Sequence, residues 1–506
     1  MTPARILIAL ALPLTLSANA AQPTAPVEVT GGAIAGVQAD GVRVYKGVPF
    51  AAPPVGDLRW RLPQPVRPWK GVRPARDFAP ACAQTAAWIT EPKSEDCLYL
   101  NVWAPAQAKR LPVIVWIHGG GYYGGSGAQG IYDGTRLARH GAVVVTVNYR
   151  LGILGFFAHP ELSAESPRHA AGNQAIHDHI AALRWVKANI ARFGGDPGLV
   201  TIAGESAGGA SIIALTTSPL AQGLFQRAIA QSASWALPFD AAEHAAYDRQ
   251  RAEEQGAAAA KALGAAHLAD LRKLDVAALH KIAWRPQTVV DGYALQDDMD
   301  TVYRQHRQND VPLLVGWNAE EGKDLAGEVL GTNDIGAANY RDLVAKLLGH
   351  APSDALLAAY PAATDAQARS SIYQLTNDWW GWRATYWSRL QAWHGKRKPY
   401  VYFYAHAPAP PASACHYGCG IGHGVEIQYV FDNLSLDQRA WTPADRQLAD
   451  RLADTWVTFA RTGSPEGNGL PAWPAFDGTN ATIMRVGDAP GHALPDFSLF
   501  PAPPSR

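Results

Sequence analysis

Short apolar runs and helical stripes alternate in the first half of the chain. Four runs have the length of buried strands, are mostly rich in β-branched residues and are bounded by turn residues. They are Leu98–Trp103, Val113–Ile117, Val143–Val147 and Val200–Ala203. Between the last two, residues 174–193 place apolar side chains at intervals of three and four, which predicts a helix packed on a sheet. Strand, helix and strand in this order predict an α/β fold with a mostly parallel central sheet and helices on both faces.

The second half of the chain is mainly helical in pattern. Residues Pro443–Arg461 repeat the apolar stripe, and Gly463 follows as a stop signal. Residues Ala241–Leu274 are rich in alanine, and Asn377–Trp382 opens a helical stretch dense in aromatics. These patterns predict large helical insertions around one sheet, whereas Gly47–Gly56 is too rich in Pro and Gly for regular structure. No linker separates independent folding units, so residues 21–506 are expected to form a single domain.

The N-terminus has the pattern of a secretory signal peptide. Arg5 precedes the apolar run Ile6–Leu16, and the small-residue site Ala18–Ala20 follows it. We therefore expect residues 1–20 to be removed after Ala20 and the mature protein to be exported, either periplasmic or extracellular. The alternative, an ordinary N-terminal helix, is disfavoured because Pro13 would lie in its middle. The run is also shorter than the roughly 20 residues that a membrane-spanning helix needs, so no membrane span is expected.

Composition and charge narrow the classes of partner. Hydrophobic residues make up 48% of the chain and charged residues 17%, which is enough apolar surface for a large core. Lys and Arg total 44 and Asp and Glu also total 44, so the formal net charge is zero. A chain without net charge lacks the electrostatic signature of nucleic-acid or anionic-membrane binding. Neutral or small partners are therefore expected.

The chain has four cysteines, an even number that can pair in an oxidising compartment. Three connectivities are possible, and the most local one joins Cys82 to Cys97 and Cys415 to Cys419. A metal site is the alternative, with the ligands Cys415, His416, Cys419 and His423. We expect no metal, because His423 has another use described below.

The pentapeptide Gly204–Gly208, with the sequence GESAG, lies between an apolar run and a start of helix made of small residues. This is the setting of a nucleophile elbow, in which a strand turns sharply into a helix and the central side chain, here Ser206, projects above the sheet. The pattern G-x-S-x-G alone is common by chance. Its position between a predicted strand and a predicted helix makes Ser206 a candidate nucleophile.

A second glycine-rich segment, His118–Gly121, follows the predicted strand Val113–Ile117. Its free backbone N–H groups, at Gly120 and Gly121, could stabilise an oxyanion together with the N–H of Ala207. The same glycines also match the dinucleotide pattern G-x-G-x-x-G. That alternative is disfavoured because the next strand ends in Asn148, where a ribose would need an acidic residue.

Several of these segments together resemble a known family. Ser94–Trp103, Phe193–Pro197 and Gly204–Gly208 look like the signatures of type B carboxylesterases, the cholinesterase-like branch of the α/β-hydrolases. The resemblance extends from about Gly31 to Phe476. It implies an α/β-hydrolase fold and the cleavage of small carboxylic esters without a metal or cofactor.

The resemblance also implies a catalytic triad. Gly316–Gly322 resembles the family segment whose glutamate precedes a glycine and serves as the triad acid, which indicates Glu321 rather than Glu320. His423–Ile427 resembles the segment that carries the catalytic histidine. The chain order serine, glutamate, histidine is the order that α/β-hydrolases use. In such a triad the histidine accepts the proton of the serine, and the glutamate orients the imidazole.

Several further residues are expected near the substrate. In the family, a disulfide equivalent to Cys82–Cys97 closes a loop over the entrance of a gorge, and here that loop contains Trp88. The expected pocket residues are Trp88, Tyr122, Glu205, Trp235 and Leu325. Trp379, Trp380 and Trp382 are candidates for the same cleft. The segment Gly322–Leu325 lacks the aromatic residues that cholinesterases tend to place near Glu321, which disfavours a choline ester as substrate. Cys415 and Cys419 are not a family feature, but a disulfide there would restrain the loop of His423.

The sequence thus predicts a secreted serine carboxylesterase that works through an acyl-enzyme. Two alternatives remain. An amidase or peptidase on the same fold would differ only in protonating an amine leaving group. A non-catalytic cholinesterase-like binding module is disfavoured because such modules typically lose the serine or histidine, and this chain keeps both.

Overall fold

The predicted strands form the centre of one large sheet. A computed structural model describes residues 21–233, 243–409, 420–436, 438–467, 471–479, 482–487 and 494–501. The four apolar runs become β9 (Tyr99–Pro105), β10 (Leu111–Ile117), β11 (Val143–Val147) and β12 (Gly195–Glu205). Within the four predicted runs every residue except Tyr99 is buried, as expected for strands covered on both faces. The predicted signal peptide lies outside the described residues.

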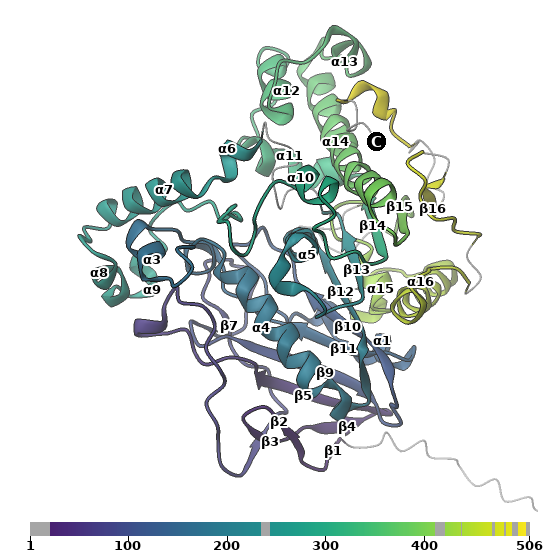
Figure 1. Cartoon of the computed structure of the whole chain (residues 1–506). Coiled ribbons are helices and arrows are strands. Elements are labelled where there is room, and N and C mark those ends of the chain that lie inside the picture. Colours follow the sequence, from purple (N-terminus) through teal and green to yellow (C-terminus); the bar gives the residue numbers. More distant parts are fainter. Residues whose placement is uncertain are drawn as a thin grey trace, which may run out of the picture.

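The sheet is mostly parallel with an antiparallel edge (Figure 1). Its strand order is β1-β4-β5-β9-β11-β10-β12-β13-β14-β15-β16. The strands not yet given are β1 (Gln22–Pro23), β4 (Val37–Ala39), β5 (Val42–Pro49), β13 (Arg227–Gln231), β14 (Leu313–Asn318), β15 (Pro399–Tyr404) and β16 (Met484–Val486). Pairing is antiparallel from β1 to β11 and parallel from β11 to β16. Two small sheets contain β2 (Val27–Val29), β3 (Gly32–Ala35) and β6 (Val72–Pro74), and β7 (Ala81–Cys82) and β8 (Lys93–Ser94).

The parallel register brings the ends of successive strands to one edge. Ile117 at the end of β10 is opposite Gly204, and Glu205 at the end of β12 is opposite Gln231 at the end of β13. Asn318 at the end of β14 pairs with Tyr404 at the end of β15. Ligands of open α/β sheets bind outside the carboxyl ends of the strands, so this edge is where a site is expected.

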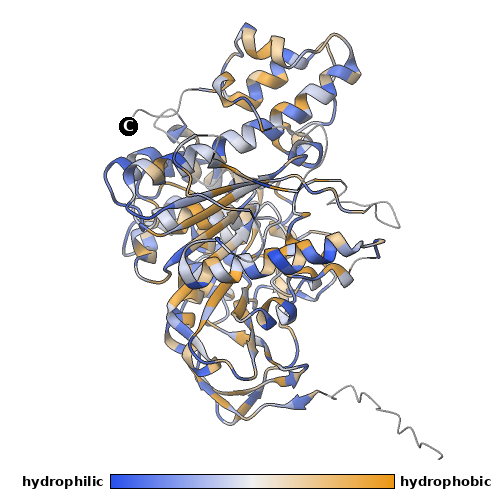
Figure 2. Cartoon of the chain, turned by 90° about the vertical axis from the view of Figure 1, so that its right-hand side faces the viewer, coloured by the Kyte–Doolittle hydropathy of each residue, from blue (hydrophilic) through white to orange (hydrophobic). Residues whose placement is uncertain are grey.

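Two predicted helices pack on this sheet with the expected bounds. α4 covers Gln174–Asn189, and a 3₁₀ turn completes the predicted segment to residue 193. α16 covers Pro443–Thr462; Thr442 and Asp445 form a capping box at its start and Gly463 ends it with φ +82°. α5 (Ala207–Thr217) packs on β12 and β13 and contacts α4, which also contacts β12. Figure 2 shows the resulting pattern, with hydrophobic colour concentrated on the strands and hydrophilic colour on outer helical turns.

The helical insertions are more divided than predicted. The region 241–274 contains α6 (His244–Tyr247), α7 (Arg249–Ala262) and α8 (Leu268–Lys273). The start predicted at Asn377 is wrong, because α14 covers Asp365–His394, where the Thr364 side chain accepts a hydrogen bond from the N–H of Gln367. Residues 47–49 were expected to be irregular, but they belong to β5, which pairs with β9 through an irregular register.

The remaining helices are α1 (Thr135–Arg139), α2 (Gly152–Gly155), α3 (Pro160–Glu165), α9 (Val276–Leu279), α10 (Met299–Arg304), α11 (Glu321–Leu330), α12 (Tyr340–Leu348), α13 (Asp354–Ala359) and α15 (Ile427–Val430). Among the described residues, no helix combines the length and the apolar character that crossing a bilayer would require. The large, mostly parallel sheet with helices agrees with the fold class predicted from the sequence.

Candidate active site

Ser206 lies at a sharp turn between β12 and α5. Its backbone has φ +56° and ψ −123°, a conformation that residues other than glycine rarely adopt. The Ser206 N–H donates to the carbonyl of Gln231 at 2.9 Å, which fixes the turn against the neighbouring strand β13. A Cβ on Gly208 would lie 2.0 Å from the carbonyl oxygen of Ile117, so only glycine allows α5 to start this close to β10. The turn therefore has the strand, helix and glycine that the sequence predicted for it.

The glycine segment after β10 lies directly beside this serine. A Cβ placed on Gly119 would be 3.0 Å from the Cβ of Ser206. Gly120, at φ +103°, accepts the N–H groups of Tyr123 and Gly124 with its carbonyl, so the segment folds back on itself in a tight turn. Within the part of the chain that is described, the N–H groups of Gly120, Gly121 and Ala207 have no hydrogen-bond acceptor. Free N–H donors next to a nucleophile are what an oxyanion hole requires.

Glu321 and His423 form a close, buried pair. Glu321 is the first residue of α11, immediately after the connection from β14, and its side chain is fully buried. Its Oε2 lies 2.6 Å from Nδ1 of His423. Its Oε1 accepts hydrogen bonds from the hydroxyl of Ser232 at 2.5 Å and from the N–H of Asn318 at 2.8 Å. Both carboxylate oxygens are thus fixed, and one of them faces the imidazole.

The neighbouring Glu320 has a different environment. Its Oε2 accepts the N–H of Ile421 at 2.9 Å, and its Oε1 pairs with Lys323. The backbone N–H of His423 donates to Asp324 at 2.8 Å, so the first turn of α11 holds the histidine loop at a second point. Of the two adjacent glutamates, Glu321 is the one whose carboxylate contacts the imidazole.

The other ring nitrogen of His423 faces Glu205. Its Nε2 lies 3.1 Å from Oε1 of Glu205, which is buried beside Ser206. Burial raises the pKa of Glu205 to about 8, against the opposing effect of His423. Burial also lowers the pKa of His423, but the carboxylates of Glu205 and Glu321 outweigh it and raise the value to about 10. Because the two groups are in contact, the titration of each depends on the charge of the other, and they titrate as a coupled pair.

A network of buried amides supports this pair, and sequence reasoning missed it. Glu426 accepts hydrogen bonds from Gln231 at 2.9 Å and from the Asn318 side chain at 2.5 Å. The same Asn318 amide donates to the carbonyl of Gly422, next to His423. Gln231 and Asn318 are the last residues of β13 and β14. Their positions at the carboxyl ends of parallel strands were the signal that could have identified them.

These residues open into one large cavity of about 1020 Å³. Ser206, His423 and Glu205 are among the residues that line it. The expected pocket residues Trp88 and Leu325 also line it. Trp88 packs edge-on against Tyr123, with ring centroids 6.5 Å apart, and the exposed fractions of the two side chains are 41% and 39%.

Two expected pocket residues do not line the cavity. Tyr122 has a fully buried side chain, and its hydroxyl accepts a hydrogen bond from Ser211 on α5 at 3.2 Å, so it packs beneath the site and Tyr123 lines the cavity instead. Trp382 stacks on Phe500, whereas Trp379 and Trp380 from the same helix reach the cavity. Trp235 lies outside the described residues. Trp380 also donates to the carbonyl of Ser232 at 2.9 Å, so it supports the strand end beside Glu321.

The predicted local disulfide between Cys82 and Cys97 is present, with the sulfurs 2.04 Å apart. Trp88 lies in the loop that this bond closes. Cys415 and Cys419 lie outside the described residues, and so does His416. The alternative metal site would also need His423, whose Nδ1 is already in contact with Glu321.

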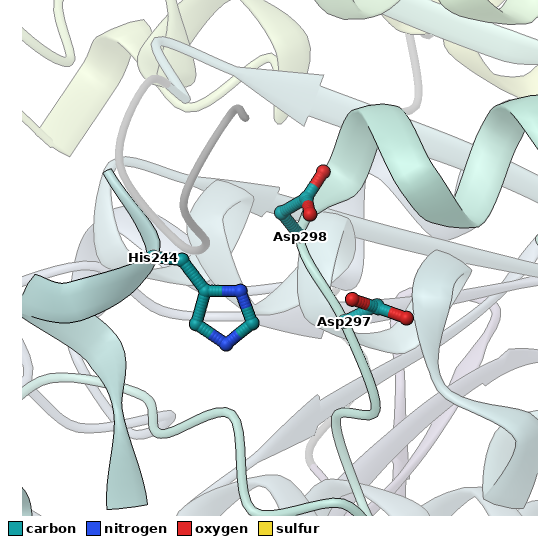
Figure 3. Close-up of side chains that lie close together, drawn as sticks. All are labelled: His244, Asp297 and Asp298. Carbon is teal, nitrogen blue, oxygen red and sulfur yellow. The ribbon is translucent and has the colours of Figure 1, made fainter. Parts of the chain in front are cut away.

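One other cluster has metal-ligand residue types (Figure 3). The ligand atoms of His244, Asp297 and Asp298 lie within 4.8 Å of one another. However, Asp298 accepts hydrogen bonds from the N–H and hydroxyl of Thr301 as the cap of α10, and Asp297 pairs with Arg307 at 2.7 Å. The aspartates therefore already serve structural roles, and we assign no metal to this cluster.

Nearly the whole chain is similar to known carboxylesterases. The sequence model of the carboxylesterase family matches residues 23–495. The chain is 38% identical to a fumonisin B1 esterase of Sphingopyxis macrogoltabida over 489 residues, covering 91% of this chain and 86% of that protein. It is 33% identical to the para-nitrobenzyl esterase of Bacillus subtilis (strain 168), covering 90% of this chain and 93% of that protein.

A solved structure of a PNB esterase superposes with a TM-score of 0.74 at 32% identity, covering 89% of this chain and 93% of that one. A second PNB esterase structure gives a TM-score of 0.75 at 30% identity. The α/β-hydrolase fold predicted from the sequence is thereby confirmed. The chain belongs to the carboxylesterase family and is a carboxylic ester hydrolase.

Proposed function

We propose that this esterase cleaves its substrates through an acyl-enzyme formed on Ser206, with His423 as general base and Glu321 as the triad acid. The observation that carries the proposal is the 2.6 Å contact between the buried Glu321 and Nδ1 of His423, a residue that lines the same cavity as Ser206. An imidazole held through Nδ1 keeps its proton there and presents Nε2 as the acceptor for a serine proton.

In the first half of the reaction, the Ser206 oxygen attacks the ester carbonyl as His423 accepts the serine proton. The carbonyl oxygen becomes an oxyanion, and the N–H groups of Gly120, Gly121 and Ala207 are the donors that stabilise it. When the tetrahedral intermediate collapses, His423 delivers the proton to the departing alcohol. The acid part of the ester remains bound to Ser206.

In the second half, water takes the place of the alcohol. His423 accepts a proton from the water as its oxygen attacks the acyl carbonyl, and the same donors stabilise the second oxyanion. Collapse of that intermediate returns the proton to Ser206 and releases the free acid. The cycle consumes one water and needs neither metal nor cofactor.

The test is the hydrolysis of 4-nitrophenyl esters of increasing acyl length by the wild type and by Ser206→Ala. We expect kcat/KM to fall by roughly 10⁴- to 10⁶-fold in the variant, because the acyl-enzyme can no longer form. Ser166→Ala is the matched control, since this serine follows α3 and does not line the cavity. A Ser206→Ala variant that keeps a tenth of the wild-type activity would overturn the proposal.

The proposal includes export. The order of Arg5, the apolar run Ile6–Leu16 and Ala18–Ala20 supports removal of residues 1–20, after which residues 21–506 form a single domain. The Cys82–Cys97 disulfide supports an oxidising destination. Mass spectrometry of the intact exported protein should give an N-terminus at Ala21, and retention of residue 1 in the active protein would contradict this part of the proposal.

A further inference from the structure

One wall of the substrate cavity is lined with arginines. Arg251 comes from α7, Arg285 from the segment before Val289, and Arg383 from α14. The net charge of the whole chain is zero, so this gathering of positive charge is local rather than a consequence of a basic composition. Clefts lined by one sign of charge concentrate ligands of the opposite sign.

Arg383 is the fixed part of this wall. Its side chain is 5% exposed, and its guanidinium donates to both oxygens of Glu243 at 3.0 and 3.2 Å. It also lies 4.6 Å above the ring of Trp379, another cavity residue. Two hydrogen bonds to one carboxylate and stacking on an aromatic ring fix the guanidinium of Arg383 in one position.

Arg251 and Arg285 differ from Arg383, because neither has an ion-pair or hydrogen-bond partner for its guanidinium among the described residues. Both residues are exposed and line the cavity. Burial raises the pKa of the Tyr247 hydroxyl, and the charges of Arg383 and Arg285 act against that rise, which places both cations near this cavity residue. The Gln287 side chain donates to the carbonyl of Ala246 at 2.7 Å, so the segment that carries Arg285 lies against the segment that leads into α7 and Arg251. Arg383 contacts the start of that same segment through Glu243.

The acidic residues of the cavity do not balance them. Glu205 faces His423 at 3.1 Å, and Glu243 is engaged by Arg383. Glu328, on α11, is the other acidic residue among those lining the cavity. The wall that carries Arg251 and Arg285 therefore keeps an excess of positive charge that a substrate can neutralise.

We infer that Arg251 and Arg285 form a subsite for a carboxylate carried by the substrate, so the enzyme prefers esters whose acid or alcohol part bears a second, free carboxylate. The inference rests on the proposed function, since it concerns substrates of the same cavity. Guanidinium forks match carboxylate geometry, and partly exposed pairs of this kind contribute about 0.2–1 kcal/mol each, which corresponds to about 1.4- to 5-fold in affinity.

The experiment compares esters that differ only in charge. The first pair is 4-nitrophenyl hexanoate and mono(4-nitrophenyl) adipate, and the second is phenyl hexanoate and 3-carboxyphenyl hexanoate. The readout is the ratio of kcat/KM for the anionic ester to that for its neutral partner, measured in the wild type and in Arg251→Gln/Arg285→Gln. We expect a ratio above one for at least one pair, and a fall of that ratio by about two- to thirtyfold in the double variant.

Two controls separate charge recognition from other effects. The ratio should fall toward one between about 0.01 and 1 M NaCl, because the Debye length shrinks from about 30 to 3 Å. Arg192→Gln removes an exposed arginine that does not line the cavity, and it should leave the ratio unchanged. Equal ratios in the wild type and the double variant would overturn the inference, as would wild-type ratios below one for both pairs.

A direct binding measurement keeps this inference separate from the proposed mechanism. If no ester is cleaved, the proposed function fails. Calorimetric titration of the folded protein with adipate and with hexanoate still tests the subsite, because it needs no turnover. Tighter binding of adipate that weakens in the double variant would support the inference, and equal binding of the two acids would overturn it.

Discussion

Glu321→Gln tests the role of the triad acid without changing the size of the side chain. In the wild type, Oε1 accepts two hydrogen bonds, from the hydroxyl of Ser232 and the N–H of Asn318, and Oε2 faces Nδ1 of His423. A glutamine has only one acceptor oxygen. Turning its NH₂ group toward the two buried donors would leave both unmatched, at a cost of about 1–3 kcal/mol each and about 2–6 kcal/mol in total.

The glutamine oxygen is therefore expected to take the place of Oε1, and its NH₂ group to face His423. That group donates to Nδ1, so the imidazole proton must move to Nε2, which can then no longer accept the proton of Ser206. A preference of about 2–6 kcal/mol corresponds to an excess of the inactive arrangement of about 30- to 20,000-fold. We expect kcat/KM to fall within this range.

The assay is the hydrolysis of 4-nitrophenyl butyrate by Glu321→Gln and Glu320→Gln, with circular dichroism to check that both fold. Glu320 is the matched control because its carboxylate contacts Ile421 and Lys323 rather than the imidazole. We expect Glu320→Gln to stay within about fivefold of the wild type, since its pair with Lys323 is partly exposed. If Glu321→Gln keeps more than a tenth of the wild-type kcat/KM, or if both variants lose activity equally, the reasoning is refuted.

Three further predictions concern pH and stability. Glu205→Gln removes a carboxylate that raises the pKa of His423, so the acidic limb of the pH profile of kcat/KM should move to lower pH. At a fixed pH on that limb, activity relative to the plateau should rise about tenfold for each pH unit of the shift. A limb that stays at the wild-type pH would contradict this. Burial raises the pKa of Asp378 to about 6, so the protonated carboxyl stabilises the folded protein at low pH. As the pH rises from about 4 to about 6, the wild type should therefore lose up to about 3 kcal/mol of unfolding free energy, whereas Asp378→Asn should not. Parallel pH profiles of the two proteins in urea denaturation would refute the claim. Replacing both Cys82 and Cys97 by Ala should cost about 3 kcal/mol in the same assay, because the bond closes a loop with a sequence separation of 15, and an unchanged urea midpoint would exclude this contribution.

The central strands could be predicted because burial on both faces leaves continuous apolar runs. Val143–Val147 was predicted with the bounds that β11 has. β12 extends beyond its predicted run at both ends, because Gly195 and Gly204 pair with β10 and Glu205 pairs with Gln231 of β13, although these residues carry no strand signal. The prediction missed the first turns of α14 because these turns are mostly polar. The aromatic residues, from which the helix was predicted, lie in its later part, and α14 packs on β14 and β15.

The site could be predicted where chemistry follows local sequence. Ser206 lies in a recognisable turn, and the Glu321 and His423 segments resemble those of a known family. The residues around them could not be predicted in the same way, because the contacts Ser232–Glu321 and Glu426–Asn318 join segments far apart in the sequence. The first contact depends on the pairing of β13 with β14, and the second on the loop that carries His423. Neighbouring aromatics such as Tyr122 and Tyr123 also give no local sign of which ring faces the cavity.

The wide spacing of the proposed triad along the chain has a consequence for biosynthesis. Ser206 and its strand are made early, whereas the partners of the ion pair at the site are 102 residues apart and the histidine comes after β15. A nascent chain that has not reached His423 contains the serine but no base to activate it. Hydrolytic activity should therefore appear only late in synthesis, so an interrupted chain poses no esterase hazard to the cell that makes it.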